Sequence, residues 1–351
     1  MQLAAHVPVA PRARCGAAAA PRARAVRVRA AQSWMSQRPD AATDDIRDTI
    51  KHTRLITALK TPYRPDGSID MAAYDRHVEN QLASGVEGFI VGGTTGEGQL
   101  MHWDEHVMLI AHTVNKFGGR AIVIGNTGSN STREALHASE QGFNVGMHAS
   151  LQINPYYGKT SPKGIVSHIS AALDVGPGIV YNVPGRTGQD IRPDLIRTLA
   201  EHPNFLGVKE CAGRERIKTY SAEGIMCWSG NDDECHDSRH YDGGLGVISV
   251  GSNILPGVWA EMMKQESPEL NASVQELCDW LFHEPNPIPV NTAMAMLGLC
   301  EPVFRLPYVP VEQDQRKKGI ELLTPFLDRI PGAKGVRDIG DEEWVLVRRA
   351  P

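Results

Sequence analysis

From Thr53 onward, eight short apolar runs rich in β-branched residues recur along the chain, and this repetition constrains the fold more than any other feature. A longer stretch with helical spacing of apolar residues follows each run, as in residues 74–82 and 104–117. Strands that alternate with helices form a parallel sheet, and eight such units close into a (β/α)8 barrel. The expected strands are Leu55–Leu59, Gly88–Gly92, Ala121–Gly125, Ala149–Asn154, Gly178–Val183, Phe205–Glu210, Ile225–Gly230 and Gly246–Val250.

A doubly wound open sheet is the alternative arrangement of the same units. Such sheets usually carry a Gly-rich nucleotide loop after the first strand, whereas this chain has Lys60–Tyr63 (KTPY) there. We therefore predict an α/β fold in which residues 53–266 form a catalytic (β/α)8 TIM barrel. Residues 267–351 are expected to form a C-terminal helical extension, broken by Pro-rich turns near 284–289 and 306–310.

The first 38 residues differ in composition from the rest of the chain. They hold seven Arg and many Ala, and the first acidic residue is Asp40. This composition is typical of an organellar transit peptide, disordered and cleaved, and a basic tail that binds nucleic acid or membrane is the less favoured alternative. Without these residues Lys plus Arg falls from 36 to 29 against 41 acids, so the net charge changes from −5 to −12. An acidic body argues against a nucleic-acid partner.

Neither a metal nor a membrane partner is expected. The six cysteines are scattered, with no C-x-x-C pair and no zinc-like spacing, so we interpret them as reduced thiols. They are Cys15, Cys211, Cys227, Cys235, Cys278 and Cys300. The consecutive acids at 232–234 are more typical of a helix N-terminus than of a metal site. No apolar stretch approaches the roughly 20 residues that span a bilayer.

Active sites of such barrels lie at the C-terminal ends of the strands. Lys209 ends the sixth apolar run, where partial burial would disfavour its ammonium form and free the amine for Schiff-base chemistry. Tyr181 ends the neighbouring run at a similar height, so its phenol could exchange protons in the same pocket. The ordinary alternatives are a solvated strand-end lysine and a core tyrosine.

Two further loops carry candidate binding groups. The sequence GGTTGEG (92–98) lacks the Gly-Lys-Ser/Thr of a P-loop, and its paired hydroxyls Thr94 and Thr95 would suit a small carboxylate. A tight turn with a threonine helix cap is the alternative. Arg186, in the turn after the fifth strand, could clamp a carboxylate through two hydrogen bonds or be a solvated cation. Thr94 and Tyr157 are the available proton-relay partners of Tyr181.

Taken together, the motifs GTTGE, PYYG, YNVP-x-RTG, GVKE and GVISV, in this order on eight predicted strands, resemble the dihydrodipicolinate synthase family. The resemblance extends from about Thr53 to Val311. The sequences GQLMHWDEH, GNDDECHD and EPNPIPVN are similar to those of its plant and algal branch. The broader group is the pyruvate-dependent class I aldolases and lyases.

The resemblance implies that Lys209 forms an imine with pyruvate, whose enamine then attacks L-aspartate 4-semialdehyde in the diaminopimelate route to lysine. It implies no cofactor beyond this covalent pyruvate imine. The implied proton relay is Tyr181, Thr94 and Tyr157, with Tyr157 reaching across a dimer interface. Thr95 would hold the pyruvate carboxylate, Arg186 the semialdehyde carboxylate, and Ile248 would place a backbone carbonyl near the lysine.

The resemblance also implies a homotetramer, a location in the chloroplast (plastid stroma), and feedback inhibition by lysine at a dimer-interface site. The matching regulatory positions are Gln99, Trp103, His106, Asn130, Glu134 and Tyr156. Two departures lie near the expected site: Gly185 where many relatives carry Ser, and Ala212 where bacterial relatives often carry Thr.

Two other functions stay open on the sequence. Another pyruvate-dependent lyase of the same group, such as N-acetylneuraminate lyase, shares the Schiff-base lysine, but Arg186 fits a short acidic aldehyde better than a sugar chain. A catalytically idle barrel that serves as a binding or scaffold protein is the second, and retention of the lysine together with all three relay residues argues against it.

Overall fold

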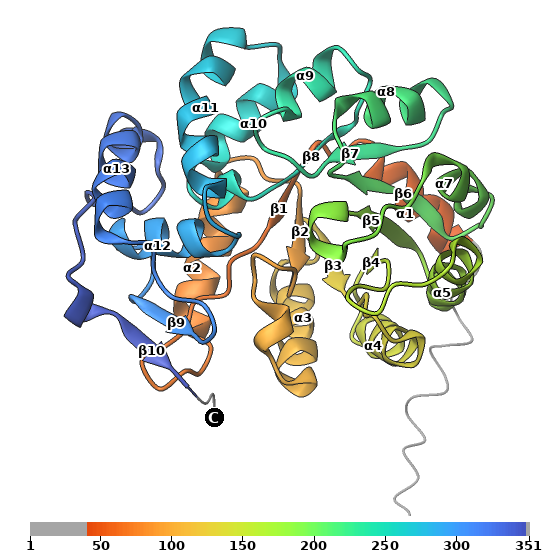
Figure 1. Ribbon diagram of the computed structural model, residues 1–351, viewed down its shortest axis with the longest axis horizontal. Helices are drawn as coiled ribbons and strands as arrows, with labels where there is room; N and C mark the ends of the chain where they lie inside the picture. The colour runs from red at the N-terminus through yellow and green to blue at the C-terminus, as the bar shows by residue number, and fades with distance from the viewer. Residues whose placement is uncertain (1–40, 349–351) are drawn as a thin grey trace, which may run out of the picture. The chain divides into compact units, whose positions relative to one another are not determined.

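The computed structural model describes residues 41–348, so the transit peptide predicted at 1–38 lies outside the described residues (Figure 1). Eight parallel strands form a closed barrel in chain order, because β1 pairs with both β2 and β8. This closed barrel confirms the predicted fold class. The strands are β1 (Leu55–Ala58), β2 (Gly88–Val91), β3 (Ile122–Asn126), β4 (Ala149–Ile153), β5 (Gly178–Asn182), β6 (Phe205–Glu210), β7 (Cys227–Ser229) and β8 (Gly246–Ser249).

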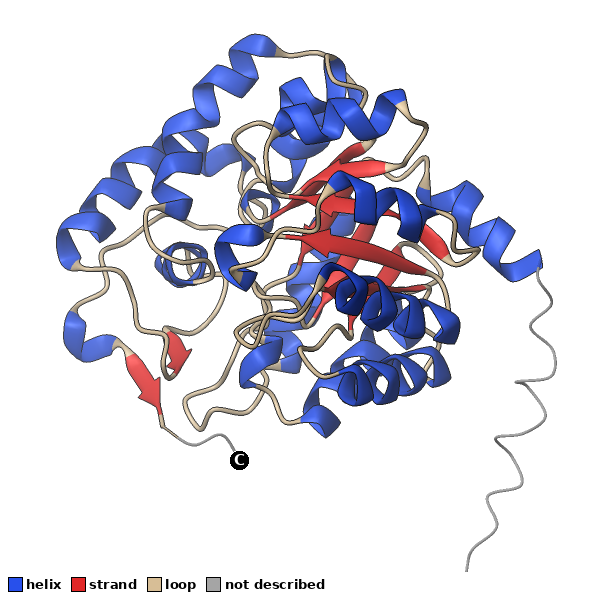
Figure 2. Ribbon diagram, turned by 45° about the vertical axis from the view of Figure 1, so that its right-hand side comes forward, coloured by secondary structure: helices blue, strands red, loops and turns tan. Residues whose placement is uncertain are grey.

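Helices follow the strands and surround them (Figure 2). The eight that complete the barrel are α2 (Met71–Ala83), α3 (Trp103–Phe117), α4 (Thr132–Asn144), α5 (Pro162–Val175), α7 (Pro193–Ala200), α8 (Arg214–Ala222), α9 (Cys235–His240) and α10 (Pro256–Lys264). The one-turn α6 (Pro184–Thr187) lies between β5 and α7. Before the barrel, α1 (Ala41–Ile50) contacts β6, where Arg47 donates a hydrogen bond to the Phe205 carbonyl at 2.8 Å.

The apolar runs became strands because a parallel barrel buries both faces of each strand. One face fills the interior, where side chains such as Ile56, Ile90 and Ile248 form one cluster. The other face packs under the helices. The observed strand bounds differ from the expected ones by at most two residues, and the largest difference is at the start of β7. An apolar pattern does not mark where the hydrogen bonds between strands begin and stop.

The C-terminal region holds α11 (Pro268–Phe282), α12 (Ile288–Met296) and α13 (Gln313–Leu323), together with a small parallel sheet of β9 (Val303–Arg305) and β10 (Val345–Val347). The sequence predicted helices alone here, because two three-residue strands far apart in the chain leave no local periodicity. Short 3-10 turns occur at η2 (Gly98–Leu100), η3 (Gly251–Asn253), η4 (Thr324–Arg329) and η5 (Asp341–Glu343). No helix within residues 41–348 has the length and apolarity to cross a membrane.

Candidate active site

Lys209 and Tyr181 are direct partners in the register of β5 and β6. The Nζ atom of Lys209 lies 4.4 Å from the centroid of the Tyr181 ring. Both side chains are buried, and burial lowers the pKa of Lys209 while it raises the pKa of Tyr181 well above its ordinary value. The structure therefore places the amine and the phenol together, as the sequence predicted, and favours the neutral amine.

A cavity of about 220 Å³ opens at the C-terminal ends of the strands around this pair. Its volume suits a small metabolite better than a nucleotide. Five of the predicted site residues line it: Lys209, Tyr181, Thr94, Thr95 and Arg186. The structure thus brings the predicted nucleophile, two relay groups and both carboxylate-binding groups to one cavity.

The C-terminal region supplies one wall of this cavity through Phe282 and Asn286. The Asn286 side-chain amide donates a hydrogen bond to Thr95 Oγ1 at 3.0 Å. Arg186, carried by α6, donates from Nη2 to the Asn286 main-chain carbonyl at 3.0 Å. Neither Thr94 nor Thr95 caps a helix, since α3 begins several residues later at Trp103.

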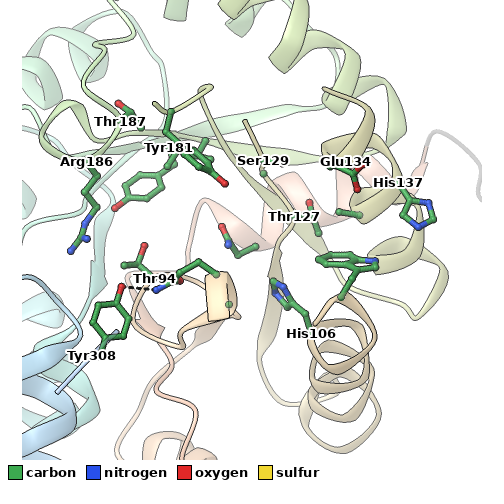
Figure 3. Close-up of a pocket in the computed structure, with 18 residues that line it drawn as sticks. Thr94, His106, Thr127, Ser129, Glu134, His137, Tyr181, Arg186, Thr187 and Tyr308 are labelled. Atoms are coloured by element: carbon green, nitrogen blue, oxygen red, sulfur yellow. Dashed lines mark hydrogen bonds between the residues drawn. The ribbon is translucent and has the colours of Figure 1, made fainter. Parts of the chain in front are cut away.

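A second cavity of about 420 Å³ adjoins the first and shares Thr94, Asn126, Tyr181 and Arg186 with it. Figure 3 shows Tyr181 and Arg186 at one end, and His106, Glu134 and His137 at the other. Five of the six predicted regulatory positions line it: Gln99, Trp103, His106, Glu134 and Tyr156. Most of the candidate regulatory positions and most of the candidate catalytic positions therefore line two adjoining cavities that share part of their walls.

Two aromatic side chains of α3, Trp103 and His106, line one end of the larger cavity. The rings of Trp103 and His106 meet edge to face with centroids 4.9 Å apart. The Trp103 indole donates to the Gln141 side-chain carbonyl of α4. Burial lowers the pKa of His106 to about 4, so its imidazole is neutral at physiological pH.

Three of the predicted residues, Tyr157, Asn130 and Ile248, line neither of these two cavities. Tyr157 is 95% exposed and, with Asn130, lines a separate surface pocket of about 280 Å³. Its backbone has a positive φ of 65°, which is uncommon for a non-glycine residue. Ile248 lies in β8 inside the barrel, and Val250 rather than Ile248 lines the cavity.

The sequence did not predict that Cys211 and Asp232 lie near Lys209. Cys211 lines the same cavity, and burial raises the pKa of its thiol to about 11. The two-residue spacing of a strand could have predicted that it shares a face with Lys209. The acids at 232–234 directly precede α9, whose N-cap is Glu234, as the sequence predicted, but Asp232 makes its hydrogen bonds elsewhere. It is buried and accepts hydrogen bonds from the Ser249 hydroxyl and two backbone N–H groups at the end of β8.

Across residues 41–348 no group of three or more His, Cys, Asp or Glu is placed to hold a metal ion.

A closed parallel barrel with a buried lysine and tyrosine at its C-terminal edge is the architecture of a TIM-barrel enzyme, and its sequence family is one of lyases. The chain belongs to the Dihydrodipicolinate synthetase family, whose sequence profile matches residues 51–325.

Relatives and solved structures agree with this membership. The chloroplastic 4-hydroxy-tetrahydrodipicolinate synthase of Nicotiana tabacum is 57% identical over 304 residues, which cover 86% of this chain and 85% of that protein. A crystal structure of the chloride-inhibited dihydrodipicolinate synthase of Acinetobacter baumannii complexed with pyruvate has a TM-score of 0.75 at 32% identity, covering 78% of this chain and 98% of the other. The Cyanidioschyzon merolae enzyme with lysine bound has a TM-score of 0.74 at 28% identity, covering 78% and 98%.

Proposed function

We propose that this protein condenses pyruvate with L-aspartate 4-semialdehyde to give 4-hydroxy-tetrahydrodipicolinate, in lysine biosynthesis. The observation that carries the proposal is the register pairing of Lys209 with Tyr181 in a cavity that also holds Thr95 and Arg186. The plant relative named for this activity favours it over a sugar lyase of the same group.

The proposed chemistry begins at the Lys209 amine. Its Nζ attacks the keto carbon of pyruvate, water leaves, and an imine forms. Loss of a proton from the pyruvate methyl group gives an enamine, whose carbon attacks the aldehyde of the second substrate. The amino group of that substrate then attacks the imine carbon, which closes the ring and releases the Lys209 amine.

The other residues bind the substrate carboxylates and transfer protons. Tyr181, with Thr94 and a Tyr157 supplied by a second chain, transfers the protons of imine formation and condensation. Thr95 binds the pyruvate carboxylate, and Arg186 presents a planar pair of N–H donors to the carboxylate of the semialdehyde. The backbone carbonyl of Ile248 is proposed to orient the amine. No cofactor takes part beyond the imine itself.

Mass spectrometry after incubation with pyruvate and borohydride tests the nucleophile, followed by coupled turnover with aspartate semialdehyde. We expect a lactyl-sized mass increase on the Lys209 peptide, absent in Lys209→Arg, together with turnover. An adduct without turnover would retain the imine and point to a sibling aldolase. Absence of any adduct would reject the mechanism.

Lysine is proposed as a feedback inhibitor that binds at the Trp103 and Glu134 end of the larger cavity, with Asn130 and Tyr156 contributing from the interface. The Glu134 carboxylate suits an ammonium group, and the Trp103 ring suits the aliphatic stem. The lysine-bound structure of a relative supports lysine as the ligand. We expect millimolar lysine to inhibit turnover and Glu134→Ala to remove the inhibition, so a flat activity curve across that range would contradict the proposal.

The location and assembly complete the proposal. Residues 1–38 are proposed to direct the chain to the chloroplast, as the names of its plant relatives suggest. Import of a fusion that carries only these residues into isolated chloroplasts tests this. The mature chain is proposed to assemble as a homotetramer, which sedimentation velocity can measure directly.

A further inference from the structure

Asn286 connects the two groups that are proposed to bind the two substrates. It lies between α11 and α12, outside the eight strand and helix units of the barrel. Its side-chain amide reaches Thr95, which follows β2, and its main-chain carbonyl reaches Arg186, which follows β5. With 5% of its surface exposed, it lines the Lys209 cavity as a nearly buried residue.

The direction of the bond to Thr95 matters chemically. A threonine hydroxyl has one proton to donate and two lone pairs that accept. The Asn286 amide donates to Thr95 Oγ1, so it occupies a lone pair and leaves the hydroxyl proton free. A free proton on Thr95 can be donated to a carboxylate, whereas an acceptor at this position would have turned the proton away from the cavity.

The hydrogen bond between Arg186 and Asn286 likewise orients a group that is proposed to bind the second substrate. One N–H of the guanidinium is held by the Asn286 carbonyl at 3.0 Å. A guanidinium is planar, so fixing one donor orients the remaining donors as well. Because this acceptor belongs to the main chain, it persists when the Asn286 side chain is replaced.

We propose that Asn286 is a positioning residue for this reaction, which fixes Thr95 as a hydrogen-bond donor to the pyruvate carboxylate through its side chain and orients Arg186 through its backbone. The inference rests on the proposed function and goes beyond it, because it gives the C-terminal extension a part in substrate binding. It also predicts different effects on the two substrates, since substitutions of the Asn286 side chain alter the binding of pyruvate alone.

Steady-state kinetics of two variants with the full mature chain test the proposal. Asn286→Ala removes the donor, and we expect the KM for pyruvate to rise about five- to tenfold, with the KM for aspartate semialdehyde within about twofold of wild type. Asn286→Asp keeps the shape but turns the donor into a charged acceptor. The new carboxylate accepts the Thr95 proton and repels the pyruvate carboxylate, so we expect the KM for pyruvate to rise more than about a hundredfold.

A double-mutant cycle shows whether Asn286 acts through Thr95. In a Thr95→Val background, Asn286→Ala should raise the KM for pyruvate no further, because the group that it orients is already gone. Asn204→Ala is the matched control, because its amide donates to the Leu173 carbonyl at 2.8 Å at the opposite end of β6. This control should lose stability without a change in the KM for pyruvate.

The outcomes are distinct. Equal rises for both substrates, or additive effects in the cycle, would show that Asn286 has only a structural role and would overturn the inference. An unchanged KM for pyruvate in Asn286→Asp would overturn it as well. If wild-type protein forms no borohydride-trapped adduct with pyruvate, the proposed function itself fails, which is a separate result.

Discussion

Lys209 is surrounded by groups that act on its charge in opposite directions. Burial lowers its pKa, and the Cys211 thiol and the Asp232 carboxylate oppose that effect when they are ionised. The pKa of Cys211 is itself raised to about 11, so the thiol is neutral at physiological pH. Burial is then opposed chiefly by Asp232, and the net direction favours the free amine that imine formation requires.

Gly230 provides the space that Lys209 and Cys211 occupy. A Cβ at this position would lie 2.3 Å from Cys211 Sγ and 3.0 Å from Lys209 Cε. We predict that Gly230→Ala displaces the lysine and slows pyruvate imine formation by at least about tenfold. Stopped-flow measurement of imine formation checks this.

The double variant Gly230→Ala/Cys211→Ala identifies the cause. Removing the sulfur clears the shorter of the two contacts, so we expect much of the rate of imine formation to return. Cys211→Ala alone is the control and should react at nearly the wild-type rate. If Gly230→Ala forms the imine as fast as wild type, the steric argument is wrong.

Glu210, the next residue on β6, makes stability depend on pH. It is fully buried, and burial raises its pKa from 4.5 to about 7, although Asn182 and the Ala212 backbone N–H donate to it. The folded chain therefore holds this proton more tightly than the unfolded chain. Stability from this group is complete below about pH 4.5, falls as the pH rises through about 7, and is level above that.

We predict that Glu210→Gln, which resembles the protonated form, removes this loss. The wild-type free energy of unfolding should fall by up to about 3 kcal/mol more than that of the variant between pH 5 and pH 8. Urea unfolding of both proteins at the two pH values measures the difference. Parallel pH profiles would show that Glu210 does not titrate in this range.

At the scale of elements, a buried ion pair fixes the loop between β2 and α3. Lys60 donates to Glu97, and both side chains are almost fully buried. Asn291 of α12 donates to the same carboxylate oxygen at 2.6 Å. Glu97 has a positive φ of 59°, so these contacts hold a strained turn directly after Thr94 and Thr95.

We predict that Lys60→Met destabilises the protein by about 3 to 5 kcal/mol, because it leaves the Glu97 charge buried without its partner. Lys60→Met/Glu97→Gln should recover part of this loss, since the charge is removed as well. Arg192→Met is the control: it breaks an ion pair with Asp194 whose side chains are 55% and 56% exposed, and should cost less than about 1 kcal/mol. Chemical denaturation measures all three, and similar losses in Lys60→Met and Arg192→Met would contradict the prediction.

The elements also show what the sequence could predict. Lys209 and Tyr181 each lie in an apolar run that became a strand, so their pairing followed from the barrel register. Asn286 carries no comparable signal, because its contact with Thr95 depends on how a Pro-rich segment 191 residues away folds back over the barrel. Local patterns describe single elements, and contacts between distant elements are set by packing.

At the scale of the whole molecule, Tyr157 is the predicted relay residue that lies outside the Lys209 cavity of its own chain. Its side chain is 95% exposed and lines a different pocket. The strand pattern places Tyr157 just after the fourth strand. It does not show whether the phenol lies in the cavity of its own chain or of another chain. If it serves the cavity of a second copy, each site combines Lys209 from one chain with Tyr157 from another.

This arrangement predicts that two defective variants restore activity together. Lys209→Arg lacks the nucleophile but keeps Tyr157, whereas Tyr157→Phe keeps the nucleophile but lacks the phenol. In a mixed dimer, the site with an intact Lys209 receives an intact Tyr157 from the partner chain. Random association of co-expressed chains then gives about a quarter of the wild-type turnover, while each variant alone is lower by at least about a hundredfold. Coupled assays of the co-purified mixture measure this. Turnover no higher than the mean of the separate variants would mean that Tyr157 does not act across an interface.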